Sequence, residues 1–182
     1  DSKKIKLILV RHEQGASHMA DGFGRATGKP GVCLATSGPG ATNLVTGIAT
    51  AHMDSGPMVA ITGQVRSYLI GSDAFQEADI IGITRPITKH SYLIKDATTI
   101  PQTVKNSFHI AGSGRPGPVL LDIPIDLQNT QIEFDGYPTK PEIRGYAVPK
   151  HGRADNITAA AKLISQAKKP LLYVGGGVNI AG

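Results

Sequence analysis

Residues 32–43, with the sequence VCLATSGPGATN, combine three structural signals in one short stretch. The apolar run at 32–36 is short and rich in β-branched and leucine residues, which is typical of a buried parallel strand. The glycine turn SGPG at 37–40 follows directly, and a helical pattern of apolar residues begins at Ala41. A strand, a glycine turn and a helix in this order predict an α/β fold.

The same alternation continues on both sides of this stretch. Further strands are predicted at 5–10 (IKLILV), 58–62 (MVAIT) and 118–123 (PVLLDI). Apolar residues at helical spacing also predict helices. These residues are Ala16, Met19, Ala20 and Phe23; Ala41, Leu44, Val45, Ile48 and Ala49; and Ile100, Val104, Phe108 and Ala111, the last group preceded by Thr98 and Thr99 as candidate caps. We therefore expect a doubly wound parallel sheet with helices on both faces.

Three polar segments follow predicted strands. They are Glu13, the turn at 37–40 and residues 63–65. In open α/β sheets, ligands bind outside the carboxyl ends of the strands. We therefore predict that these segments converge on one edge of the sheet.

The C-terminal part of the chain has a different character. Residues 137–152 are polar and spaced by prolines, which predicts an interdomain linker. Beyond it, PLLYVGGG at 170–177 predicts a strand with a glycine turn, and a preceding helix is predicted from Ile157, Ala160, Ala161 and Ile164. We expect one domain at 1–136 and the beginning of a second α/β domain at 153–182, in a chain that is a piece of a longer one.

The composition argues against several classes of protein. No apolar run approaches the roughly 20 residues of a membrane helix, so we predict no membrane association. The formal charge of +5 comes from scattered Lys and Arg, and aromatic residues make up only 5% of the chain. Because nucleic-acid sites combine a basic stripe with stacking residues, we predict no nucleic-acid partner.

Cysteine and histidine usage gives two further predictions. Cys33 is the only cysteine, which suits a reducing compartment, and we predict a cytoplasmic protein. The six histidines show no metal-ligand spacing, so no metal site is predicted within this chain.

Each polar motif, taken alone, also has a structural explanation. The amides of the turn at 37–40 suit an anionic ligand group, but tight packing between strand and helix explains the turn equally well. No Gly-Lys-Ser/Thr follows it, and Asn43 stands where a dinucleotide fingerprint has its third glycine. Glu13 suits the first turn of a helix because of the helix dipole. The sequence DAFQEAD at 73–79 is compatible with a short capped helix.

The glycines at 15, 22 and 24 are harder to explain by helix stability. Each costs about 0.5–1 kcal/mol relative to alanine inside a helix. Three of them in one predicted helix indicate that something must approach this helix closely.

Together, five motifs resemble a known family in their order and spacing. They are RHEQGASHMADGFGRATGKPGV (11–32), TSGPGATN (36–43), GPMVAITGQV (56–65), DAFQEAD (73–79) and SGRPGPVLLDIP (113–124). They resemble the N-terminal pyrimidine-binding domain of thiamine-diphosphate enzymes, and most closely the large catalytic subunit of acetolactate (acetohydroxyacid) synthase. The resemblance covers nearly the whole chain and begins after the family's first strand and helix.

The resemblance implies a role for Glu13. Its carboxylate would hydrogen-bond a ring nitrogen of the cofactor's aminopyrimidine and favour the protonated, imino form that takes the proton from the thiazolium carbon. The implied neighbours on the pyrimidine side are Pro39, Gly40 and Asn43.

Further residues have roles that only the resemblance implies. Phe75 and Gln76 would face the reacting centre, with Gln76 as a polar contact to substrate or cofactor. Arg115 matches a position that contacts FAD, and the middle domain would meet the same flavin at Gly175 and Gly176.

The implied activity is that of a carboligase, which decarboxylates pyruvate and transfers the two-carbon unit to a second 2-oxo acid. The family acts as a homodimer or homotetramer, in some cases with a regulatory subunit. It holds Mg²⁺ and the diphosphate through a Gly-Asp-Gly followed by Asn, and this chain contains no Gly-Asp-Gly. We therefore expect the metal on a domain outside this chain. The alternatives are another thiamine-diphosphate-dependent decarboxylase or carboligase with a different acceptor, and a non-catalytic nucleotide-binding module.

Two residues depart from the family pattern and bear on the substrate. Ile125 stands where the synthases commonly have Lys near the entrance of the active site, and Arg66 stands where they have Pro, Ser or Ala. We count both as candidate substrate-pocket residues.

Overall fold

The computed structural model describes residues 4–149 and 151–181, and its sheet has four strands. The strands are β1 (Gly31–Ala35), β2 (Met58–Gln64), β3 (His90–Leu93) and β4 (Pro118–Pro124). They lie in the order β1-β2-β4-β3, and every neighbouring pair is parallel. Because β2 and β4 are covered on both faces, their sequences are almost continuously apolar. The predicted parallel sheet is confirmed.

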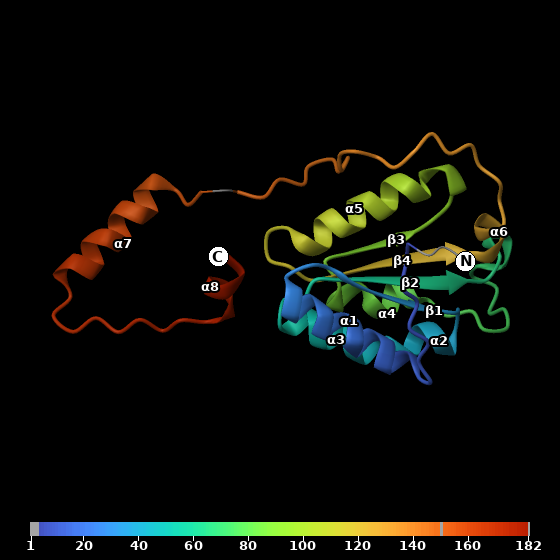
Figure 1. Ribbon diagram of the computed structural model, residues 1–182, viewed down its shortest axis with the longest axis horizontal. Coiled ribbons are helices and arrows are strands. Elements are labelled where there is room, and N and C mark those ends of the chain that lie inside the picture. Colours follow the sequence, from blue (N-terminus) through green and yellow to red (C-terminus); the bar gives the residue numbers. More distant parts are fainter. Residues whose placement is uncertain (1–3, 150, 182) are drawn as a thin grey trace. The chain divides into compact units, whose positions relative to one another are not determined.

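Helices cover both faces of this sheet (Figure 1). Helix α5 (Ile100–Gly112) lies on one face, against β2 and β4. Helices α1 (Glu13–Thr27), α3 (Val45–Met53) and α4 (Ile80–Thr84) lie on the other. The remaining helices of this part are α2 (Pro39–Asn43), α6 (Ile125–Gln128) and the 3₁₀ helices Ser67–Leu69, Arg85–Ile87 and Ala97–Thr99. The doubly wound α/β arrangement is therefore confirmed.

One of the three helix glycines allows a close approach within the chain. A Cβ at Gly24 would lie 2.5 Å from the Pro57 carbonyl oxygen, so α1 can reach the start of β2 only with glycine here. Gly15 and Gly22 have open space on their outer side, because no heavy atom of the described residues would lie within 4 Å of a methyl group added at either position. Whatever requires these two glycines is not a neighbour within the described part of the chain.

Two predicted strands are wrong. Residues 5–10 and 170–174 form no strand, and most of their apolar side chains are exposed, with Leu7 at 84% and Leu171 at 90%. A strand exists only where a neighbouring strand pairs its backbone groups, and neither segment has such a neighbour among the described residues. The glycine turn predicted at 175–177 instead leads into helix α8 (Gly176–Ala181).

The predicted helices exist, but their details differ. The helix expected from Ala41 to Ala49 is two helices, α2 and α3, which meet at the fully buried Leu44. Thr99 precedes α5 without making a side-chain cap, whereas Asp96 accepts a bond from the Thr98 amide.

The apolar face expected for α1 is also wrong in part. Met19 and Phe23 are about half exposed. The face of α1 that packs against the sheet and α3 is small and polar instead; its buried residues are Ser17, Ala20, Asp21 and Gly24.

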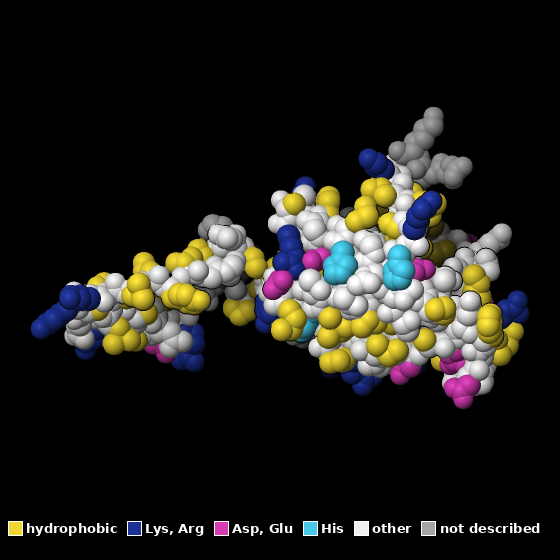
Figure 2. Space-filling view, turned by 90° about the horizontal axis from the view of Figure 1, so that it is seen from below, with side chains coloured by type: hydrophobic (Ala, Val, Ile, Leu, Met, Phe, Trp, Pro, Cys, Tyr) yellow, Lys and Arg dark blue, Asp and Glu magenta, His cyan; other side chains and the backbone are white. Residues whose placement is uncertain are grey.

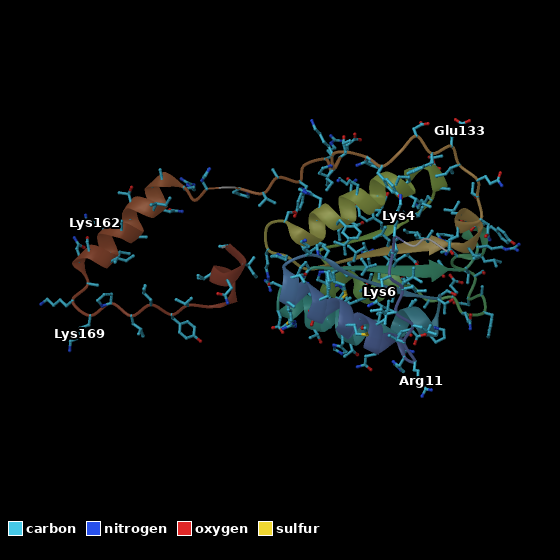
Figure 3. All side chains as sticks on the ribbon, viewed as in Figure 1. Lys4, Lys6, Arg11, Glu133, Lys162 and Lys169 are labelled. Atoms are coloured by element: carbon cyan, nitrogen blue, oxygen red, sulfur yellow. The ribbon has the colours of Figure 1, made fainter. Side chains whose placement is uncertain are left out.

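The chain divides into two units, Asp1–Ile143 and Arg144–Gly182. The boundary falls inside the linker predicted at 137–152, while the domain limits 1–136 and 153–182 remain predictions. The second unit contains α7 (Ala154–Gln166), as the helical spacing predicted, and α8. Its labelled lysines, Lys162 and Lys169, point away from the backbone of that unit (Figure 3). Within the described residues, no helix has the length and hydropathy needed to cross a membrane.

Candidate active site

The carboxyl edge of the sheet brings together the three segments predicted to converge there. Helix α1 runs antiparallel to β1, so Glu13 in its first turn lies at this edge. A methyl group at Gly40 would lie 3.5 Å from Glu13 Oε1, which places the glycine turn beside the carboxylate. One at Gly63, near the end of β2, would contact the Ser37 amide at the same distance.

Glu13 is held in its ionised form. Asn43, at the end of α2, donates a hydrogen bond from Nδ2 to Glu13 Oε2 at 3.0 Å. That bond is the main reason why the pKa of Glu13 lies below its ordinary value, and a hydrogen bond from the Glu13 backbone amide acts in the same direction. His12 caps α1 by accepting a bond from the Gln14 amide. A fixed carboxylate therefore stands at the sheet edge, with one oxygen committed to Asn43 and the other facing Gly40.

The glycine turn also receives a second loop. Gly38 has a φ of 61°, which favours glycine, and a Cβ here would lie 2.6 Å from the Gln76 carbonyl oxygen. The backbone of residues 73–79 can approach the end of β1 only because position 38 has no side chain. The Gln76 backbone is thereby placed beside Gly38, the residue that precedes α2.

The loop at 73–79 is not the short helix that its sequence suggested. Asp73 and Gln76 both have positive φ angles, which non-glycine residues adopt rarely. The Glu77 carboxylate closes the loop by accepting bonds from the Gly71 and Ala74 amides, and these bonds lower its pKa. Phe75 is 89% exposed at the tip. The loop therefore presents Phe75 outward in a strained but hydrogen-bonded conformation.

A buried polar cluster lies directly beneath this edge, and sequence reasoning missed it. Asp122 of β4 accepts bonds from Thr62 (2.7 Å) and Gln64 (2.9 Å) of β2. Asp122 is only 1% exposed, and burial raises its pKa to about 6 despite those two bonds. A signal did exist in the sequence, because a lone carboxylate in the apolar run PVLLDI demands buried partners.

The candidate substrate-pocket residues lie at the same edge. Ile125 begins α6, is 42% exposed and lines a cavity of about 550 Å³ together with residues of β1 and β2. Arg66 donates to the Tyr68 hydroxyl. The Ser67 amide donates to Asp126, so the segments that carry Arg66 and Ile125 are joined by a hydrogen bond.

Arg115, one of the candidate flavin residues, is not brought together with Glu13. Arg115 precedes β4 and therefore lies at the opposite, amino edge, where it donates to the Ser55 hydroxyl and the Met53 carbonyl. Gly175 and Gly176 belong to the second unit. Among the described residues, no cluster of three or more His, Cys, Asp or Glu side chains has the arrangement of a metal site.

Comparison with known proteins agrees with this geometry. Residues 1–83 match the family model of the thiamine pyrophosphate enzymes, N-terminal TPP binding domain. This part of the chain is therefore similar in sequence to the TPP-binding domain of the thiamine pyrophosphate enzyme class.

The similar proteins are more specific. The chain is 59% identical to an acetolactate synthase of Arthrospira platensis over 98% of its own length and 31% of the relative's. It is 58% identical to the acetolactate synthase large subunit of Corynebacterium glutamicum, over 97% of this chain and 28% of the relative. For the large subunit of Haemophilus influenzae the values are 56%, 97% and 31%. The chain thus spans about a third of the length of these relatives.

Proposed function

We propose that this chain supplies the pyrimidine-binding half of the active site of an acetolactate synthase-like carboligase. The parent protein would decarboxylate pyruvate and transfer the two-carbon unit to a second 2-oxo acid. The observation that carries the proposal is the ionised Glu13 carboxylate, fixed by Asn43 beside the bare backbone of Gly40. The names of the similar proteins, acetolactate synthase and acetolactate synthase large subunit, support the same activity.

The residues fit thiamine diphosphate at this edge. The cofactor supplies carbanion chemistry that protein side chains lack. Glu13 would accept a hydrogen bond from the protonated ring nitrogen of the aminopyrimidine, and its lowered pKa keeps it a carboxylate able to do so. Pro39 and Gly40 would lie against the pyrimidine, and a side chain at position 40 would take up space next to Glu13 Oε1.

Two further residues would act on the substrate side. Gln76 stands beside the glycine turn and would donate its carboxamide N–H to an oxygen of the 2-oxo acid or the cofactor. The exposed Phe75 would cover the reacting groups from water once the other half of the site is in place.

The test is Glu13→Gln in the full-length protein. Glutamine keeps the shape and the acceptor oxygen but loses the charge, so proton exchange at the reactive carbon of bound thiamine diphosphate should slow by at least tenfold. Asp155→Asn is the matched control, because Asp155 is also a first-turn helix acid but lies in the second unit. Exchange at the wild-type rate in Glu13→Gln would show that this carboxylate has no catalytic role.

One observation favours a second candidate function, which differs from the first in the acceptor substrate. Ile125 lines the edge cavity where the synthases commonly have Lys, so no ammonium stands at this position to attract a carboxylate. This observation favours, as the second candidate, a thiamine-diphosphate-dependent carboligase with a less acidic acceptor.

We also propose that Mg²⁺ and the diphosphate are held outside this chain, since its sequence has no Gly-Asp-Gly. FAD would contact Arg115, at the edge of the sheet opposite Glu13, and Gly175 and Gly176 are the proposed flavin residues of the second unit. The two cofactors would then occupy separate edges. A cytoplasmic location is proposed from the single cysteine.

The proposed homodimer or homotetramer would use the outer face of α1. This face presents Gly15, Met19, Gly22 and Phe23 to solvent. In the larger unit, hydrophobic and uncharged atoms cover the middle of the face that carries α1 and α3, and charged side chains lie toward its margins (Figure 2). The open space at Gly15 and Gly22 would let a second subunit approach closely. A regulatory subunit is a further proposed partner.

A further inference from the structure

Gln64 makes a three-way hydrogen-bonded connection at the end of β2. Its Nε2 donates to Asp122 Oδ2 and to the Ala78 carbonyl oxygen, both at 2.9 Å, and its Oε1 accepts from the Val65 amide. Ala78 belongs to the loop 73–79, two residues beyond Gln76. A single buried side chain therefore joins the centre of the sheet to the loop.

Asp122 fixes the orientation of this carboxamide. If the carboxamide of Gln64 were flipped, its Oε1 would face both the Asp122 carboxylate and the Ala78 carbonyl. Three hydrogen-bond acceptors would then lie together with no donor among them. Thr62 in turn holds the other oxygen of Asp122. Gln64 and Asp122 are both almost completely buried, so water cannot replace a lost bond without opening the site.

The loop is thus clamped on two sides. Gly38 accommodates the backbone of Gln76 on one side, and Gln64 binds the Ala78 carbonyl on the other. Gln76 itself has a φ of 61°, a conformation that persists only where its surroundings hold it.

We infer that Gln64 and Asp122 are positioning residues, which hold the loop 73–79, and with it Phe75 and Gln76, at the carboxyl edge. The catalytic consequence rests on the proposed function, because Gln76 matters only if it contacts substrate or cofactor. The structural consequence does not, and the two are tested separately.

The first experiment measures amide hydrogen exchange in the full-length protein without cofactor. Gln64→Leu removes two donors to the loop and the sheet, and should speed exchange in residues 71–79 by about tenfold relative to α5. Asp122→Leu should do the same, whereas Asp122→Asn can still accept from Gln64 and should stay within about twofold of wild type.

The matched control is Asn106→Leu. Asn106 is a buried carboxamide of α5 that also ties a distant backbone segment, by donating to the Glu142 carbonyl and accepting from its amide. Its loss should speed exchange near residue 142 and leave residues 71–79 unchanged. The inference is overturned if Gln64→Leu leaves exchange in 71–79 unchanged, or raises it only in parallel with exchange throughout the larger unit.

The second experiment is a double-mutant cycle on the cofactor-loaded enzyme. If Gln64 acts through the loop, Gln64→Leu should lower kcat at least tenfold in wild type and less than threefold in a Gln76→Ala background. Equal losses in both backgrounds would refute positioning of Gln76. A Gln76→Ala variant with full activity would refute the proposed role of Gln76, while the exchange result would still decide whether Gln64 and Asp122 hold the loop.

Discussion

Alanine at Gly22 and at Gly24 should change the stability of the chain in opposite directions. Both glycines lie in α1, so each replacement gains about 1 kcal/mol of helix propensity. At position 22 the new methyl group meets no atom of the described residues within 4 Å, and the full gain should appear. Because the glycine-to-alanine difference in a helix is roughly 0.5–1 kcal/mol, Gly22→Ala should stabilise the chain by that amount.

At position 24 the same methyl group would lie 2.5 Å from the Pro57 carbonyl oxygen and 3.2 Å from its ring. That carbonyl also accepts the Gly31 amide at the start of β1, so moving it strains the first strand. Overpacking of this kind costs about 1–3 kcal/mol, which exceeds the propensity gain over most of that range. Gly24→Ala should therefore lower stability by up to about 2 kcal/mol.

Urea unfolding of the chain, followed by circular dichroism, measures both effects. With a slope of about 2 kcal/mol/M, the two midpoints should differ by roughly 0.25–1.5 M while the slopes stay equal. Midpoints that shift in the same direction would refute the contact between α1 and Pro57. In the full-length protein, Gly22→Ala should also weaken self-association, because the proposed subunit contact needs the space that is open in the single chain.

Three further predictions follow from the site. Burial raises the folded-state pKa of Asp122 above its unfolded value, so the stabilising contribution of Asp122 is present below about pH 4 and is lost as pH rises through about 6. The free energy of unfolding of wild type, measured relative to that of Asp122→Asn, should therefore fall between these pH values. A difference that does not change with pH would contradict the raised pKa. In steady-state kinetics of the full-length protein, Ile125→Lys should lower the KM for pyruvate and Arg66→Ala should raise it, each severalfold. If the KM is unchanged in both variants, neither residue binds the substrate. The isolated chain should bind thiamine diphosphate only weakly, since it offers half of the site, and micromolar affinity in calorimetry would contradict this.

Two of the predicted strands have sequences that indicate burial on both faces, whereas β1 was predicted from its apolar run although Val32 and Leu34 lie on an exposed face. Residues 58–62 and 118–123 are apolar because helices cover them above and below, and they form β2 and β4. Residues 5–10 are equally apolar, but no strand of the described residues pairs with them, and pairing is a tertiary property that composition does not reveal. The sequence HSYL of β3 was missed for the converse reason, because its parallel pairing with β4 makes it a strand without an apolar run.

For the site as well, features with a local sequence pattern could be predicted and features that depend on tertiary contacts could not. Glu13 and Asn43 were predicted as site residues from the family resemblance of their motifs, and the structure joins them by a hydrogen bond, while their roles remain predictions. The connection from Asp122 through Gln64 to Ala78 has no local pattern. Its members come from two strands and a loop, and only the register that places Thr62 opposite Asp122 brings them together.

The central position of β4 has a consequence for synthesis on the ribosome. β4 separates β2 from β3, and Thr62 of β2 is paired with a residue 60 positions later. Until β4 has left the exit tunnel, β2 lacks one neighbour and β3 has none, so their apolar surfaces stay exposed while more than half of the chain is made. Long-range parallel pairing is slow and leaves such intermediates prone to aggregation. Nascent chains that end before Pro118 should therefore depend on chaperones, and chains that extend past Pro124 should become resistant to protease together with the whole sheet.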